Sequence, residues 1–336
     1  MHQYVQRHTS GIVDESLLAD RVIRFLYSSE RENPSLLQRA LATPKVTEWL
    51  AHWEFDRHLS EPAQRIAAVV KRLSINTSEI LGGTAQMRTL RDLFERKIRY
   101  WDARPLPEKE ALIVSPADGK ALPFAANVES SLPIKEKFIG MGPLLADCNP
   151  WGDAIDATNG VAGVVVRLTP DVYHYTHAPV SGHVISHRSV EGAFHSCNPI
   201  AATRLLSSYP RNRPTVTVYD TDVQDGTGVG IVVQADVAAM MIGQIVSCYS
   251  ALQYDNPMPL RPGMWVERGS PVSLFRPGSS TSIVLWKGSR AAIASELIAN
   301  SERADLRSRF SDWLQTAWVE TALRVRQPIS ESTQGR

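Results

Sequence analysis

The most constraining feature of this sequence is a series of short β-branched runs between about residues 105 and 286. Clusters of glycine, proline, asparagine and aspartate separate these runs, which is the pattern of strands joined by turns. Five runs are prominent: ALIVS (111–115), GVVVRL (163–168), TVTVYDTDV (215–223), GVGIVVQADV (228–237) and TSIVLW (281–286). We therefore predict a mostly β core.

Helical spacing flanks this β-rich stretch on both sides. From residue 16 to about residue 95, apolar residues recur at steps of three and four, and Ser60-Glu61-Pro62 has the composition of a helix start. The same spacing returns between residues 291 and 325. We predict an α+β protein with an N-terminal helical region at residues 1–92, a mostly β core at 93–290, and a C-terminal helix with a polar tail at 291–336.

The C-terminal segment has an apolar stripe. Leu306, Phe310, Trp313 and Trp318 fall near one face at helical spacing, and arginines flank them. Two interpretations fit this stripe. It either packs against the core, which we favour, or contacts a membrane surface or a partner.

Charge and hydropathy exclude several classes of protein. The chain has 36 basic and 35 acidic residues, so it lacks the overall positive field that attracts nucleic acid. Its longest apolar run, VAAMMIGQIV at residues 237–246, is much shorter than the roughly 20 residues that span a bilayer. The N-terminus does not resemble a secretory signal. We predict a cytoplasmic protein without a nucleic-acid partner.

Cysteine and histidine usage predicts no metal site. The three cysteines are odd in number and lack CxxC spacing, which favours reduced thiols: Cys148, Cys197 and Cys248. Five histidines fall close together, but without an HExxH motif or a cysteine that completes a ligand set: His174, His177, His183, His187 and His195. The last three are typical of strand or loop surfaces. His174 and His177 lie in a turn-rich segment that can direct a side chain into a site.

Two further turns carry reactive side chains. Asp118 stands in VSPADGK (114–120), directly after the apolar LIV run, and Gly278-Ser279-Ser280 follows a proline and precedes a strand-like run. The second turn matches neither the GxSxG elbow nor a phosphate-binding loop. Each turn alone is typical of an ordinary connection.

Together, an aspartate, a histidine and a serine on separate turns can form a catalytic triad. Asp118 would orient His177, and His177 would take the proton of Ser279. A serine after glycine can attack the carbonyl of its own preceding peptide bond. The resulting ester undergoes β-elimination, and hydrolysis of the dehydroalanine leaves a pyruvoyl group. This built-in ketone replaces an external electron sink such as pyridoxal phosphate.

The same segments resemble the phosphatidylserine decarboxylase family. VSPADGK, RLTPDVYHYTHAPVSGHV, VAAMMIGQIV and VERGSPVSLFRPGSSTSIVLW occur in the family's order, after FERKIRYWDARPLP, so the resemblance covers about residues 93–286. It implies that Asp118 and His177 assist the self-cleaving serine and that His174 acts in decarboxylation. It also implies a scissile bond between Gly278 and Ser279, a pyruvoyl group formed from Ser279, and a mature enzyme of two chains that commonly forms homodimers.

The cleavage motif departs from the form that many family members have. A Gly-Gly-Ser-Thr form aligns without a gap to Ser280, whereas a Leu-Gly-Ser-Thr form aligns to Ser279. We favour Ser279, because Gly278 has no Cβ and can adopt the backbone geometry that exposes its carbonyl to attack. Pro277 is also unusual, since it fixes φ just before the scissile bond.

The substrate is less constrained than the chemistry. The resemblance implies conversion of phosphatidylserine to phosphatidylethanolamine and carbon dioxide, with peripheral membrane contact. However, the N-terminal helical region carries regular charges, such as Arg21, Arg24 and Glu30, and the family also includes soluble relatives that decarboxylate free amino acids such as tryptophan. A soluble amino-acid decarboxylase is therefore the alternative.

Two readings without catalysis are less favoured. VSPADG and RPGMWVERGSPV resemble strands of a lipoyl-type carrier module, but no lysine stands at a hairpin tip between them. An uncleaved scaffold with the same fold is the other reading. The presence of Asp118, His177, Gly278 and Ser279 argues against it.

Overall fold

The computed structural model describes eleven stretches of the chain: residues 2–7, 9–15, 55–56, 59, 61–126, 160–189, 213–238, 245–277, 280–308, 310–311 and 316–332. Several predicted features lie outside these residues. They are Cys148, Cys197, His195, Trp313, the Gly278-Ser279 pair, and residues 16–54 of the predicted N-terminal helical region, with Arg21, Arg24 and Glu30.

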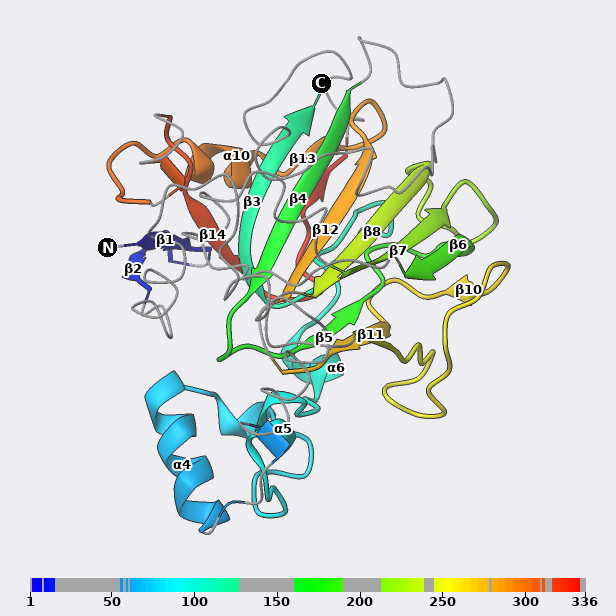
Figure 1. The fold of residues 1–336 in the computed structure, drawn as a ribbon. Coiled ribbons are helices and arrows are strands. Elements are labelled where there is room, and N and C mark those ends of the chain that lie inside the picture. Colours follow the sequence, from blue (N-terminus) through cyan, green and yellow to red (C-terminus); the bar gives the residue numbers. More distant parts are fainter. Residues whose placement is uncertain are drawn as a thin grey trace, which may run out of the picture.

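A ten-stranded sheet forms the centre of the molecule (Figure 1). All neighbouring strands are antiparallel except the parallel pair β1–β14, and the order is β10-β6-β7-β8-β12-β4-β3-β14-β1-β2. The strands are β1 (Gln3–Gln6), β2 (Ile12–Asp14), β3 (Gly119–Ala126), β4 (Val161–Leu168), β6 (Gly182–Ser189), β7 (Arg213–Asp220), β8 (Ile231–Ala238), β10 (Trp265–Val266), β12 (Ser280–Lys287) and β14 (Glu320–Leu323).

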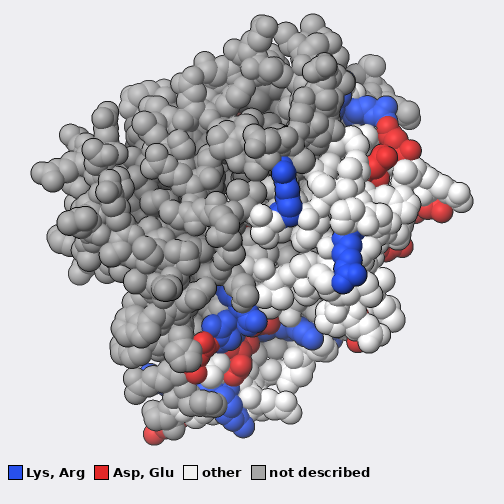
Figure 2. All heavy atoms as spheres, turned by 45° about the vertical axis from the view of Figure 1, so that its right-hand side comes forward, with Lys and Arg blue, Asp and Glu red and all other residues white. Residues whose placement is uncertain are grey.

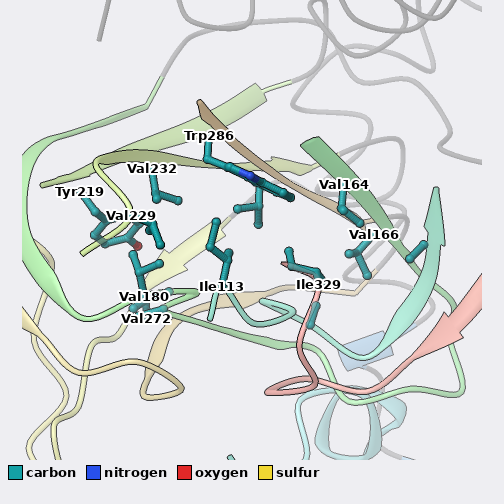
Figure 3. Close-up of a cluster of buried hydrophobic side chains, with 14 of the residues drawn as sticks. Ile113, Val164, Val166, Val180, Tyr219, Val229, Val232, Val272, Trp286 and Ile329 are labelled. Carbon is teal, nitrogen blue, oxygen red and sulfur yellow. The ribbon is translucent and has the colours of Figure 1, made fainter. Parts of the chain in front are cut away.

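The central strands are apolar because they are buried. All eight residues of β4 are buried, and β12 is buried up to Trp286. Figure 3 shows Trp286 and Val164 packed with Ile113 and Ile329, which come from segments that lie across the sheet. The indole Nε1 of Trp286 donates a hydrogen bond of 2.8 Å to the Ala291 carbonyl, so its polar atom is satisfied within the core.

A smaller sheet lies beneath the main one and carries the histidine segment (Figure 1). Its strands are β5 (Tyr175–His177), β11 (Pro271–Phe275) and β9 (Ile245–Ser247), all antiparallel, in the order β5-β11-β9. An aromatic cluster packs against it, including Tyr100, Tyr173 and Tyr254. A two-stranded sheet joins β13 (Ala292–Ile293) to β15 (Ser330–Glu331).

The helices before the core form a unit with a small hydrophobic core of its own. They are α4 (Pro62–Leu73), η2 (Thr77–Glu79), α5 (Leu90–Phe94) and α6 (Tyr100–Ala103). Ile66 of α4 packs with Ile80 and Leu93. In Figure 1, α4 and α5 lie at the bottom of the view. As predicted, α4 begins at Pro62, and Ser74 ends it in the left-handed conformation with φ 53°.

The predicted fold class is confirmed, since the chain is mostly β with helices toward both ends. Three details of the prediction are wrong. The ALIVS run forms only an isolated bridge between Val114 and Pro328, and β3 follows it. Residues 3–14 contribute strands β1 and β2 instead of helices. The C-terminal helix α10 spans only Ser295–Ser301, and strands β14 and β15 follow it.

Two residues of the apolar stripe in the C-terminal segment lie in the core, and Trp318 is half-buried. Leu306 and Phe310 are buried, and Leu306 packs with Val5 of β1 and Val319. The N-terminal strand therefore covers the residues that could otherwise have met a membrane. The packing interpretation is confirmed for these two residues.

Candidate active site

The predicted cleavage pair lies in the link between β11 and β12, and the strands on either side of this link adjoin the histidine segment. Antiparallel pairing of β11 with β5 aligns Pro271 with His177, and the Phe275 amide donates a 3.1 Å hydrogen bond to the His174 carbonyl. At the other end of the link, Ser280 pairs with Leu168, just before the loop that leads to His174. Each side of the link thus borders the same segment.

Asp118 stands at the start of β3, where a dense set of donors holds its carboxylate. Arg104 binds it with two hydrogen bonds, from Nε to Oδ1 at 3.1 Å and from Nη2 to Oδ2 at 2.8 Å, and the Val325 amide donates to Oδ1 at 2.7 Å. Burial disfavours the charged guanidinium, but Asp118 and Glu79 outweigh this effect and raise the pKa of Arg104. The pair is a fixed, charge-assisted contact.

The His177 ring is fully buried, and both of its nitrogens have partners. Nδ1 lies 2.7 Å from the Gly269 carbonyl, which can only accept, so Nδ1 carries the proton. Nε2 then accepts from the Tyr173 hydroxyl at 3.0 Å, and Tyr173 lies 2.8 Å from the Tyr254 hydroxyl. Burial lowers the pKa of His177 to about 3, although the bond to Gly269 opposes this shift. The ring is therefore neutral near pH 7.

The predicted contact between Asp118 and His177 is wrong in its geometry. The carboxylate is engaged by Arg104 and Val325, and the Gly269 carbonyl occupies the position on Nδ1 that a triad carboxylate would take. Asp118 reaches the ring only through its charge, which favours protonation of His177. The roles of both residues in self-cleavage stay predictions.

His174 is equally buried but has a different environment. Its ring lies against Phe94 of α5, with ring centroids 3.6 Å apart, and neither nitrogen forms a hydrogen bond of normal geometry with a described residue. Burial lowers its pKa well below the usual range, and the charge of Arg96 adds to this effect. A buried imidazole without a well-formed hydrogen bond to a described residue is unusual, and it is typical of a residue that acts on a ligand.

Sequence reasoning missed four residues of this site: Arg104, Tyr173, Gly269 and Phe94. All four lie in the segments that carry the family resemblance, in FERKIRYWDARPLP, RLTPDVYHYTHAPVSGHV and VERGSPVSLFRPGSSTSIVLW. The double contact between Arg104 and Asp118 spans fourteen positions, and the bond between His177 and Gly269 spans ninety-two. No local spacing encodes such pairs.

The other predicted side chains occupy ordinary positions. His183 and His187 lie on strand β6, as predicted. Cys248 is a free thiol, and burial raises its pKa to about 12, so it is an unreactive residue. Ser280 is fully buried in β12, and its hydroxyl forms no hydrogen bond with a described residue.

Among the described residues, one group has the spacing of metal ligands. His2, Glu15 and Glu320 place their ligand atoms within 4.8 Å of one another. However, the Arg167 guanidinium already binds both carboxylates, each at 2.7 Å from Nη2. Burial opposes ionisation of Glu320, yet Arg167 and His2 lower its pKa. The group is best described as a buried ion-pair network that fixes the N-terminal strands to β14.

Comparison with known proteins identifies the family of this chain. A family model described as phosphatidylserine decarboxylase matches residues 90–309. The chain belongs to the phosphatidylserine decarboxylase family. Among similar proteins is the phosphatidylserine decarboxylase proenzyme of Fusobacterium nucleatum, 26% identical over 304 residues, which are 89% of this chain and 92% of the relative.

Two further relatives give the same result. The phosphatidylserine decarboxylase proenzyme of Ruminiclostridium cellulolyticum is 24% identical, with 90% of this chain and 93% of the relative covered. That of Chlamydia pneumoniae is 26% identical, with 89% and 91% covered. The family consists of carboxy-lyases made as proenzymes that carry a pyruvoyl group. Among the described residues, no helix has both the length and the apolar character needed to span a bilayer.

Proposed function

We propose that this chain cuts itself between Gly278 and Ser279, converts Ser279 into a pyruvoyl group, and then decarboxylates phosphatidylserine to phosphatidylethanolamine. One observation carries the proposal. The link between β11 and β12 starts beside His174, through the bond from the Phe275 amide, and ends beside Leu168, through the pairing of Ser280. The histidine segment therefore borders the cleavage motif from both sides.

Self-cleavage needs no external reagent except water. The Ser279 hydroxyl oxygen bonds to the Gly278 carbonyl carbon, its proton leaves to a base, and the peptide C–N bond breaks as the nitrogen is protonated. Loss of the Ser279 Cα proton then breaks the Cβ–O bond, leaving a Gly278 carboxylate and a dehydroalanine. The dehydroalanine tautomerises to an imine, and water hydrolyses it to the pyruvoyl group with release of ammonia.

The neutral His177 ring supports a role as the base. Because Nδ1 donates to the Gly269 carbonyl, Nε2 is the ring atom that can accept a proton. The Tyr173 hydroxyl already lies 3.0 Å from Nε2 and continues to Tyr254, so a chain of hydroxyl groups leads away from the ring. Asp118 would favour proton uptake through its charge.

The geometry of β12 favours Ser279 over Ser280 as the nucleophile. Ser280 already belongs to the strand and pairs with Leu168 on one side and Ala238 on the other. A residue held in a regular ladder has little freedom to approach its own preceding carbonyl. Its buried hydroxyl without a described partner nevertheless keeps Ser280 as the alternative.

His174 fits a role toward the pyruvoyl group and its substrate. When present, a pyruvoyl group supplies a ketone that condenses with the substrate amine and draws electrons from the α-carbon as carbon dioxide leaves. His174 has two buried ring nitrogens without a hydrogen bond of normal geometry to a described residue, in the segment next to the cleavage link. We assign His174 to the substrate side, where it holds or moves the proton at the substrate α-carbon.

Phosphatidylserine is favoured as substrate because the relatives are named for it. One observation favours the alternative, a free amino acid such as tryptophan. Leu306 and Phe310 of the predicted apolar stripe are buried, so these two side chains do not meet a bilayer. Figure 2 shows a face on which basic side chains lie singly or beside acidic ones, so its described part presents no basic patch for an anionic bilayer. Contact with lipid would have to use another surface. A homodimer of the two-chain form remains part of the proposal.

Release of carbon dioxide tests this function. The cleaved protein is given phosphatidylserine vesicles, or free tryptophan and serine in the same buffer. His174→Ala is the matched control for loss of the reaction without loss of cleavage. We expect release from the vesicles alone. Turnover confined to free amino acids would overturn the lipid substrate, and no turnover on either would overturn the decarboxylase.

A further inference from the structure

Strand β8 carries a carboxylate in the interior of the main sheet. Asp236 is 4% exposed and lies between Ala235 and Val237, which are both fully buried. Burying a carboxylate is costly unless hydrogen bonds replace its water, and an apolar residue of similar size would avoid that cost. Asp236 is therefore expected to have a specific task in the structure.

Four side chains donate to this carboxylate. Thr176 Oγ1 donates to Oδ2 at 2.8 Å and Ser273 Oγ donates to the same oxygen at 2.6 Å. Ser282 Oγ donates to Oδ1 at 2.5 Å, and Gln234 Nε2 lies 3.2 Å from Oδ1. Every donor is itself buried. The carboxylate replaces its lost water with protein hydroxyl and amide groups.

The three hydroxyl donors come from the three strands that border the cleavage motif. Ser273 is on β11, five positions before Gly278, and Ser282 is on β12, three positions after Ser279. Thr176 is on β5, between His174 and His177. One carboxylate thus connects the chain before the predicted cut, the chain after it, and the segment with both histidines.

The backbone ladder beside the carboxylate is irregular at one point. The register of β11 against β5 shifts between Pro271 and Ser273, where the ladder is irregular. Ser273 is the first residue after this shift. Its hydroxyl lies 2.5 Å from the Thr176 hydroxyl and also donates to Asp236. The carboxylate therefore joins β11 to β5 beside the irregular point of their ladder.

We propose that Asp236 is a positioning residue for self-cleavage. It does not touch the reacting atoms, but it fixes the two ends of the cleavage link against the strand that carries Thr176. This inference rests on the proposed cut between Gly278 and Ser279. After that cut, Ser282 belongs to the C-terminal chain, while Asp236, Thr176 and Ser273 belong to the N-terminal chain, so the same bonds join the mature chains.

The test measures the half-time of cleavage in freshly refolded precursor of the full chain. Thr176→Val keeps the size of the side chain but removes its hydrogen bond, whereas Thr176→Ser keeps the hydroxyl. Thr321→Val on β14 is the matched control, because Thr321 is also fully buried and its hydroxyl has no hydrogen-bond partner among the described residues. Ser282→Ala removes a second donor, and Asp236→Asn changes the acceptor.

We expect Thr176→Val and Ser282→Ala to lengthen the half-time by at least about tenfold, the factor that corresponds to one hydrogen bond to a charged group. Thr176→Ser and Thr321→Val should stay within about twofold of wild type. If Asp236→Asn fails to fold, the single-donor variants decide. Equal half-times for Thr176→Val, Ser282→Ala and wild type would overturn the inference. A wild-type chain that is never cut would instead overturn the proposed function.

Discussion

The two histidines of the β5 segment are three residues apart, both fully buried, and opposite in their bonding. His177 uses both ring nitrogens, one on the Gly269 carbonyl and one on the Tyr173 hydroxyl. His174 stacks on Phe94, and neither of its nitrogens has a hydrogen bond of normal geometry with a described residue. Burial lowers the pKa of both rings.

This difference in hydrogen bonding assigns different tasks to two histidines that lie close together in the sequence. A ring fixed at both nitrogens has one tautomer and one orientation, which suits a reaction that the folded chain performs once on itself. A ring without a well-formed hydrogen bond to a described residue keeps its hydrogen-bonding capacity for a ligand. We assign His177 to maturation and His174 to turnover on this basis.

The largest expected effect comes from His177→Ala. Removing the base should leave the precursor uncut, with a cleavage rate reduced at least about 100-fold, since positioned acid–base groups contribute roughly that factor or more. Gel electrophoresis of the denatured protein over time measures the remaining precursor. His183→Ala on β6 is the control and should cleave normally, because His183 is exposed and β6 pairs with β7 and β10, not with β11 or β12. Normal cleavage of His177→Ala would remove this residue from the mechanism.

His174→Ala should show the reverse pattern. Cleavage should be complete, while carbon dioxide release should fall by about 100-fold or more, because only the bound substrate needs this ring. Intact-mass analysis and carbon dioxide release on the same sample separate the two steps. A variant that decarboxylates at nearly the wild-type rate would make His174 a structural residue.

The pH dependence of cleavage distinguishes His177 from an ordinary histidine. Because burial lowers its pKa to about 3, the ring stays neutral as the pH falls from 8 to 5. The cleavage rate should change less than about twofold over this range, whereas a base of ordinary pKa, about 6.5, would lose roughly thirtyfold. A tenfold fall centred near pH 6.5 would contradict the buried, neutral ring.

The free energy of unfolding should depend on pH even where the cleavage rate does not. Below about pH 6.5 the unfolded chain protonates its histidines, while the folded chain keeps His177 and His174 neutral. The unfolded state then binds more protons, so the free energy of unfolding falls by about 1.4 kcal/mol per pH unit for each such histidine. Urea denaturation of an uncut Ser279→Ala precursor at several pH values measures this slope. A slope unchanged in His174→Leu would show that this ring does not contribute.

The smallest expected effect comes from removing the Tyr173 hydroxyl, which donates to His177. Tyr173→Phe leaves Nε2 without its donor and should lower the free energy of unfolding by about 1–3 kcal/mol. Tyr175→Phe is the matched control, because Tyr175 stacks on Tyr173 but has no hydrogen bond from its hydroxyl to a described residue. Equal losses in the two variants would show that the Tyr173 hydroxyl, with its contacts to His177 and Tyr254, contributes nothing.

Much of the fold follows from local patterns. The runs at residues 163–168, 215–223 and 281–286 contribute to β4, β7 and β12, because β-branched runs between turn residues favour strands. ALIVS failed as a strand because it crosses the core and pairs only at Val114. Strand β14 was taken for helix because its apolar residues also fit helical spacing, and its parallel partner β1 is more than 300 positions away.

The site was predictable only as far as its motifs. Asp118, His174 and His177 were found because they stand on turns of recognisable composition. Gly269 could not be predicted, because it contributes a backbone carbonyl, and every residue type has one. Asp236 is recognisable in the sequence as an acidic residue within the mostly apolar run IVVQADVA. Its donors could not be predicted, because they lie up to sixty positions away.

Intact mass of the denatured wild-type protein tests the central claim most directly. We predict two fragments, one ending at Gly278 and one whose first residue, 279, is blocked as a pyruvoyl group. Ser279→Ala should remain one chain of 336 residues, and Ser280→Ala should still be cut. Reversed outcomes for the two variants would move the cleavage site to Ser280. A wild-type protein that stays one uncut chain would contradict self-cleavage altogether.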